Sequence, residues 1–185
     1  MRVFHLLIIF GFCFYGCNKS KEMKEKLFPE RPYEAAKIDN FYWADVGWDY
    51  AMVPLIKPYK LTKLQGKKEW LLNSSISKNE IGDITPLESF SVNDIYIYGI
   101  QNEDLNFDET EMNPKVYFVI NTKDLKITYF EKESDFKSEL KKLNLTEEML
   151  TPDAVFEQYK NNPVLPWFPE DIKKQLEEVK KQKGN

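Results

Sequence analysis

The sequence is poor in the two side chains that most often carry catalysis or bind metals. Its one histidine is His5 and its two cysteines are Cys13 and Cys17, so neither type occurs beyond residue 17. That longer part of the chain can form neither a Ser-His-Asp triad nor a Cys-His dyad. It also lacks the ligands that zinc, copper and haem favour, and it cannot close an internal disulfide. We therefore expect no cofactor, and catalysis would have to use carboxylate, lysine, serine or tyrosine groups or an oxygen-bound metal.

Strong charge of one sign and long apolar runs are also missing. The 26 basic and 30 acidic side chains leave a formal net charge of −4 over 185 residues. A balance this mild and mixed argues against a nucleic-acid-binding surface, so nucleic acid is not an expected partner. The one long apolar run, residues 3–15, is shorter than the roughly 20 residues that a helix needs to span a bilayer.

The first seventeen residues have the layout of an export signal. A single basic residue precedes a largely apolar stretch, and Gly16 and Cys17 stand before a polar segment. Glycine followed by cysteine at this junction resembles the bacterial lipoprotein signal, although Phe14 and Tyr15 depart from the leucine and small residue usual there. In that family the peptidase cuts before a cysteine that already carries diacylglycerol. The resemblance implies that Cys17 is lipidated and anchors the chain to a membrane of the cell envelope.

A polar segment follows the signal of residues 1–17. Residues 18–32 hold mostly charged and polar side chains and end in two prolines, which is typical of a tether. Asn18 is not the aspartate that retains lipoproteins at the inner membrane in the best-known sorting rule. In a Gram-negative cell the resemblance therefore implies an outer-membrane protein that faces the periplasm. The remaining residues, 33–185, are long enough for a single globular domain with its own core.

Runs of β-branched and aromatic residues predict strands in the first two thirds of that domain. The predicted strands are residues 50–56, 69–73, 92–100, 115–121 and 125–131. Pro54 cannot donate to a strand ladder, so the first strand is expected at a sheet edge. The last two strands are the clearest hairpin in the chain. Polar stretches at 74–91 and 101–114 are expected to be loops.

Helical periodicity begins only after the hairpin. The predicted helices are residues 134–143, 151–162 and 170–182. Ser134 is expected to cap the first of them, and Thr151 the second, where Pro152 suits the first helical turn. Strands early and helices late indicate an α+β fold, with an antiparallel sheet of about 4–6 strands and two or three helices that are mostly C-terminal.

Aromatic side chains are densest at residues 41–50, which hold five of them. A few aromatic anchors often supply most of the energy of a protein interface. We therefore expect Trp48 and Tyr50 to form part of a binding surface, with Asp45 and Asp49 as its polar rim. The other three tryptophans are expected in the core, where large aromatic side chains usually lie.

Two groups of acidic residues suggest other chemistry. Asp45 and Asp49, beside the aromatics, could serve as the carboxylate pair of a glycoside hydrolase, although surface or capping roles are commoner for such residues. The alternating oxygen side chains from Asp104 onward resemble the start of an EF-hand calcium loop. That loop needs glycine at its sixth position and glutamate at its twelfth, and here these are Glu109 and Lys115. We therefore expect no metal site.

The sequence thus favours a lipid-anchored envelope protein that acts by binding a protein partner and is not an enzyme. Two alternatives stay open. The hairpin and helix of residues 115–143 resemble modules of small bacterial immunity proteins, which implies a periplasmic protein that neutralises a toxin. The second alternative is a hydrolase that uses carboxylates. A neighbouring toxin gene would favour the first alternative, and a polar cleft that joins two carboxylates would favour the second.

Overall fold

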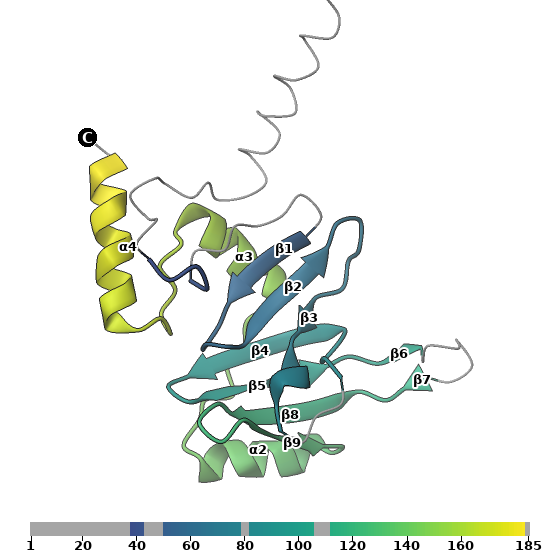
Figure 1. Cartoon of the computed structure of the whole chain (residues 1–185). Coiled ribbons are helices and arrows are strands. Elements are labelled where there is room, and N and C mark those ends of the chain that lie inside the picture. The colour runs from purple at the N-terminus through teal and green to yellow at the C-terminus, as the bar shows by residue number, and fades with distance from the viewer. Residues whose placement is uncertain (1–37, 43–49, 79–81, 106–111, 184–185) are drawn as a thin grey trace, which may run out of the picture. The chain divides into compact units, whose positions relative to one another are not determined.

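The computed structural model describes residues 38–42, 50–78, 82–105 and 112–183 (Figure 1). Within them the chain forms two antiparallel sheets of three and four strands, a short strand pair and three α-helices. The helices follow the strands along the chain, so the predicted α+β fold is confirmed. The strands are divided between two main sheets rather than gathered in one.

The smaller sheet, called sheet A here, has the strand order β1-β2-β3. Its strands are β1 (Tyr50–Pro54), β2 (Lys60–Leu64) and β3 (Leu71–Leu72). β1 stands at the edge of sheet A, as its proline requires. The predicted strand at 69–73 shortens to the two residues of β3, which pair with Leu61 and Thr62 of β2.

The larger sheet, sheet B, has the order β4-β5-β8-β9. Its strands are β4 (Leu87–Asn93), β5 (Tyr96–Gln101), β8 (Val116–Asn121) and β9 (Lys126–Phe130). β8 and β9 are the predicted hairpin, and they pair without a break from Tyr117 and Phe130 to Asn121 and Lys126. Leu125 turns the chain with a positive φ of 54°.

The two stretches predicted as loops, 74–91 and 101–114, contain regular secondary structure, so these two predictions were wrong. The polar stretch 74–91 contains the 3₁₀ helix η2 (Ser74–Ile76) and most of β4, and the single strand expected at 92–100 is divided by a turn at Asp94, whose φ is 45°. A register shift between Leu87 and Ser89 breaks the alternation of β4, which hid this strand from a period-two pattern. The acidic stretch 101–114 carries the short pair β6 (Asp104–Leu105) and β7 (Met112–Asn113).

The two faces of sheet B are covered to different extents. Successive side chains of a strand point to opposite faces, and the strand register carries this alternation across the sheet. On one face, the inner face, five large apolar side chains are each at most 2% exposed, whereas Tyr129 of the end strand β9 is 43% exposed. The five are Phe90, Ile97, Phe118, Ile120 and Ile127. On the other, outer face, Tyr98 and Val119 pack against Phe136 and Leu140 of the helix α2 (Glu133–Lys142).

The starts of two helices test the predicted caps. Thr151 caps α3 (Pro152–Asn161) as predicted, because its Oγ1 accepts a hydrogen bond from the Ala154 N–H at 3.4 Å. The predicted cap at Ser134 is wrong. α2 begins at Glu133, with Lys132 at the cap position and no side-chain cap hydrogen bond there. The Ser134 hydroxyl lies inside the first turn and donates to Asp135 instead.

The two C-terminal helices bury the apolar stripes that the sequence predicted. α3 buries Val155, Phe156 and Tyr159, and α4 (Glu170–Lys183) buries Ile172, Leu176 and Val179. The segment between them contacts sheet A, because the Trp167 indole Nε1 donates to the Pro54 carbonyl at 3.1 Å. This hydrogen bond joins the segment between α3 and α4 to the edge strand β1.

Candidate functional site

Most of the predicted site residues lie outside the described residues. These are Cys17, Asp45, Trp48 and Asp49, together with Trp43 and the centre of the acidic loop after Asp104. Tyr50 alone can be placed. It is the half-buried first residue of β1, and its neighbour across the strand pair is Leu64, which is 61% exposed. The proposed surface formed by Trp48, Tyr50 and the two aspartates therefore stays a prediction.

Two further tryptophans are described. Trp70 is 2% exposed, which confirms its expected place in the core. Trp167 is half-buried, with its ring centroid 6.2 Å from that of Phe90. Both act in packing rather than as exposed anchors.

A groove lies beside α2 on the outer face of sheet B, and we call it the α2 groove. Its volume is about 230 Å³, and it is lined by Ser89, Ile100, Tyr117, Glu133, Phe136, Lys137, Leu140, Glu147 and Met149. The floor is apolar and partly aromatic, with the rings of Tyr117 and Phe136 stacked at 5.2 Å between centroids. It draws residues from β4, β5, β8, α2 and the segment after α2.

The groove forms because α2 buries too few side chains to cover the whole outer face of sheet B. Phe136 and Leu140 are its only buried residues among ten. The chain after α2 returns to the edge of β4, where Phe90 and Leu150 exchange two backbone hydrogen bonds of 2.9 and 2.8 Å. Between helix and returning chain, the outward residue Ser89 of β4 is too small to fill the space, and its hydroxyl reaches the Met149 sulfur at 3.6 Å.

Charged side chains form a rim around the apolar floor. Lys137 lies between two carboxylates, 2.9 Å from Glu133 and 3.5 Å from Glu147. A further ion pair joins Lys115 to Glu88 at 2.7 Å, and Glu133 interacts electrostatically with Lys115 as well. These five residues thus make an alternating chain of acids and bases.

The ion pairs keep the rim charged. The hydrogen bond from Lys137 holds the pKa of Glu133 below its usual range, and the same bond raises the pKa of Lys137. Both groups are therefore ionised throughout the neutral range. A general acid for hydrolysis needs the opposite shift, a carboxyl pKa that is raised toward neutrality.

No protein-family model, curated protein or solved structure matches this chain. Its function has to be inferred from the residues themselves. Among the side chains that the structure describes, no three from histidine, cysteine, aspartate and glutamate are grouped so that they could hold a metal ion. Within the same residues, no helix has both the length and the apolar character needed to cross a membrane.

The hydroxyl of Tyr98 is buried beneath α2 and has no hydrogen-bond partner among the residues that the structure describes. It belongs to the same apolar cluster as Phe136 and Leu140. A buried hydroxyl without a partner costs stability. This oxygen therefore does not stabilise the packing of α2 against sheet B.

The groove could not be predicted from the sequence, because the residues that line it lie as far apart along the chain as Ser89 and Met149. One signal was present. The predicted helix after the hairpin offered only Phe136, Leu140 and Leu143 for packing. Such a narrow apolar stripe leaves part of a four-stranded sheet uncovered.

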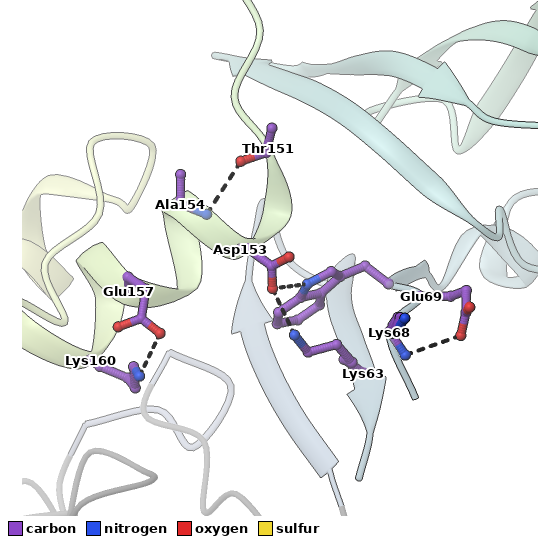
Figure 2. A network of polar contacts seen from close by, with 9 residues as sticks. Lys63, Lys68, Glu69, Thr151, Asp153, Ala154, Glu157 and Lys160 are labelled. Carbon is purple, nitrogen blue, oxygen red and sulfur yellow. Dashed lines mark hydrogen bonds and ion pairs between the residues drawn. The ribbon is translucent and has the colours of Figure 1, made fainter. Parts of the chain in front are cut away.

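A second group of polar contacts joins α3 to sheet A (Figure 2). Asp153, in the first turn of α3, accepts two bonds on one oxygen, from the Trp70 Nε1 at 2.8 Å and from the Lys63 ammonium at 2.6 Å. The Lys63 ammonium also lies 4.7 Å from the centroid of the Trp70 ring, and Trp70 meets Phe156 edge-on at 5.4 Å. This network fastens the start of α3 to β2 and to the residue before β3.

The protonation of Asp153 is linked to the stability of this contact. Partial burial pushes the pKa of Asp153 up, but the bonds from Lys63 and Trp70 outweigh it and hold the pKa below its usual value. The contribution is therefore complete above the pKa of an unfolded aspartate, roughly 3.9. It is lost as the pH falls through the lower pKa of the folded state.

We expect Asp153→Ala to lower the free energy of unfolding by about 1–3 kcal/mol, because the buried Trp70 N–H would lose its acceptor. Asp153→Asn is the matched control, since its carbonyl oxygen can still accept that bond at neutral pH. Urea unfolding at pH 7 measures both variants. Equal losses for the two would contradict the role given to the Trp70 bond.

Proposed function

We propose that this chain is a lipid-anchored envelope protein that binds a protein partner in the α2 groove and is not an enzyme. The observation that carries the proposal is the apolar, partly aromatic floor within a charged rim. Protein interfaces have this arrangement, with an apolar centre and a polar edge. The anchor rests on the resemblance of Gly16-Cys17 to the lipoprotein signal. In a Gram-negative cell we place the protein at the outer membrane, facing the periplasm.

The size of the groove favours a protein over a small molecule. Pockets for small molecules usually measure about 300–1,000 Å³. The α2 groove has about 230 Å³, which suits one or two side chains of a partner. The rest of the contact would spread over the rim and the exposed side of α2.

The same site gives little support to hydrolysis. Glu133 and Glu147 share the ammonium of Lys137, and the pKa of Glu133 is lowered by it. A glycoside hydrolase needs one carboxyl group that stays protonated near neutral pH. For Asp45 and Asp49, which lie outside the described residues, this alternative stays open.

A toxin is one class of partner to test first. The predicted hairpin and helix that resemble modules of immunity proteins are β8, β9 and α2, and they supply Tyr117, Phe136 and Lys137 to the groove. A toxin gene beside the gene for this chain would support the reading as an immunity protein. Without one, an accessory lipoprotein with a resident envelope partner is favoured.

A larger side chain at position 89 can fill the groove and leave the core intact. We expect Ser89→Leu to place its side chain in the groove and to weaken partner binding by about 30-fold, the effect of losing a central interface contact of about 2 kcal/mol. Stability should change little, because the leucine enters existing space. The matched control is Ser91→Leu, a half-buried serine two residues along β4 on the same face, outside the lining of the groove.

The measurement is capture from an extract of the organism's own envelope, with each variant immobilised at equal amounts. A band that is lost with Ser89→Leu and kept with Ser91→Leu would identify the groove partner, and titration of that partner would give the affinity ratio. Equal capture by the two variants would refute the groove as the binding site.

A further inference from the structure

Positive charge is concentrated along strand β2 and the first part of the β2–β3 connection, just before Glu69, in an otherwise acidic protein. Residues 57–68 contain five lysines and no acidic side chain, whereas the whole chain has a net charge of −4. The end of this hairpin, residues 64–68, is called the tip here. It reads Leu64-Gln65-Gly66-Lys67-Lys68, and it connects two neighbouring strands of sheet A.

The tip is a tight turn that presents an apolar side chain. The Lys67 N–H donates to the Leu64 carbonyl at 3.1 Å, and Gly66 takes a φ of +79°, which favours glycine. Leu64 is 61% exposed, the most exposed of the large apolar side chains that the structure describes. The turn therefore presents an exposed leucine between Lys63 and Lys67.

The lysines of the tip are only partly neutralised. Lys63, just before it, pairs with Asp153 at 2.6 Å. Glu69 follows the tip, and its carboxylate accepts the backbone N–H of Lys68 at 3.2 Å rather than an ammonium. Within the described residues, Lys67 and Lys68 form no ion pair. The tip therefore keeps a positive field around its leucine.

We propose that the tip contacts the anionic lipid headgroups of the membrane in which the chain is anchored. Lysines near a negatively charged bilayer each strengthen binding by about fivefold, and an apolar side chain can enter the headgroup region beside them. Leu64 would enter this region, and Lys67 and Lys68 would lie among the phosphates. This contact would add to the lipid on Cys17 and would fix which side of the domain faces the bilayer.

The distance along the chain permits this contact. Twenty residues separate Cys17 from Ile38, the first described residue, and a chain of that length spans at most about 70 Å when extended. A tether of that length leaves the domain free to approach the bilayer with the tip toward it. The inference rests on the proposed lipidation of Cys17, and it concerns residues that lie outside the α2 groove.

The test uses the full chain, purified from membranes with its anchor and reconstituted into vesicles. The photo-crosslinking amino acid p-benzoylphenylalanine replaces Leu64. The matched control carries it in place of Lys123, an exposed residue of the β8–β9 turn. One set of vesicles contains equal parts of phosphatidylglycerol and phosphatidylcholine, and the other contains phosphatidylcholine alone. Mass spectrometry identifies lipid adducts and the acylation of Cys17.

We expect lipid adducts from position 64 in the anionic vesicles and about tenfold fewer from the control position. Lys67→Gln combined with Lys68→Gln should lower the yield at position 64 by about tenfold or more. Equal yields in neutral vesicles, or a protein adduct instead of a lipid adduct in native envelopes, would overturn the proposal. Acylated Cys17 without lipid adducts at position 64 would overturn the tip contact alone, whereas unmodified Cys17 would overturn it together with the proposed anchor.

Discussion

Gly99→Ala is expected to destabilise the domain by about 3 kcal/mol or more, the upper range for overpacking a core. Gly99 lies in β5 at the centre of sheet B, and its register partners on the two neighbouring strands are Phe90 and Phe118. A Cβ atom there would clash with the backbone carbonyl oxygen of Ser89, and it would lie 2.9 Å from the Phe90 Cα and 3.1 Å from the Phe118 ring. Two of these three atoms belong to the backbone, so relief requires the separation of paired strands.

The control for this substitution is Gly82→Ala. Among the described residues other than its chain neighbours, Gly82 has no atom within 4 Å of the position that a Cβ would take, and its φ is not in the positive range. We expect a change within about 1 kcal/mol, and alanine can even stabilise by restricting the unfolded chain. Urea unfolding of both variants gives the comparison. A Gly99→Ala protein as stable as the control would mean that β4 and β5 are less closely paired than described.

Cys17→Ser is expected to abolish acylation and to move the protein from the detergent phase to the aqueous phase on phase partitioning. The thiol of Cys17 is the group that carries the diacylglycerol in the lipoprotein reading, and serine cannot replace it in that modification. Each buried CH₂ of an acyl chain contributes about 0.8 kcal/mol to membrane binding. Removal of the chains therefore removes their contribution to membrane binding.

Cys13→Ser is the matched control, because Cys13 lies within the signal and before the expected cut. It should leave both acylation and partitioning unchanged. If Cys17→Ser retains the size and the phase of the unaltered protein, the lipoprotein reading is wrong. If both variants lose the lipid, then residue 13 matters for processing in a way that the signal pattern does not explain.

The sequence was most informative where structure is local. The β8–β9 hairpin, the Thr151 cap and the buried stripes of α3 and α4 each depend on residues within a few positions of one another, so periodicity and capping rules predicted them. The α2 start was missed by one residue. Local rules favour serine as a cap, but here the hairpin that ends at Phe130 leads directly into the helix.

Strand β4 and the α2 groove could not be predicted for a different reason. A bulge near Glu88 lets both Leu87 and Phe90 be buried although they are three residues apart. The strand therefore lacks the strict alternation by which strands are recognised. The groove depends on tertiary packing, because residues such as Ser89 and Met149 meet only after the chain returns to β4. Composition shows only that histidine and cysteine are absent beyond residue 17, and the expectation of a binding role that follows from this absence stays a prediction.

The two faces of sheet B are buried to different extents, and this difference determines which substitutions each face can tolerate during evolution. Residues of the inner face, such as Phe118 and Ile120, are enclosed on every side, so substitutions there must preserve volume. The outer face around α2 carries small or half-exposed residues such as Ser89 and Met149, where a new side chain meets open space. Mutations can therefore accumulate there at little risk to folding. Descendants of this chain should keep the same interior and differ most in the side chains of this outer face.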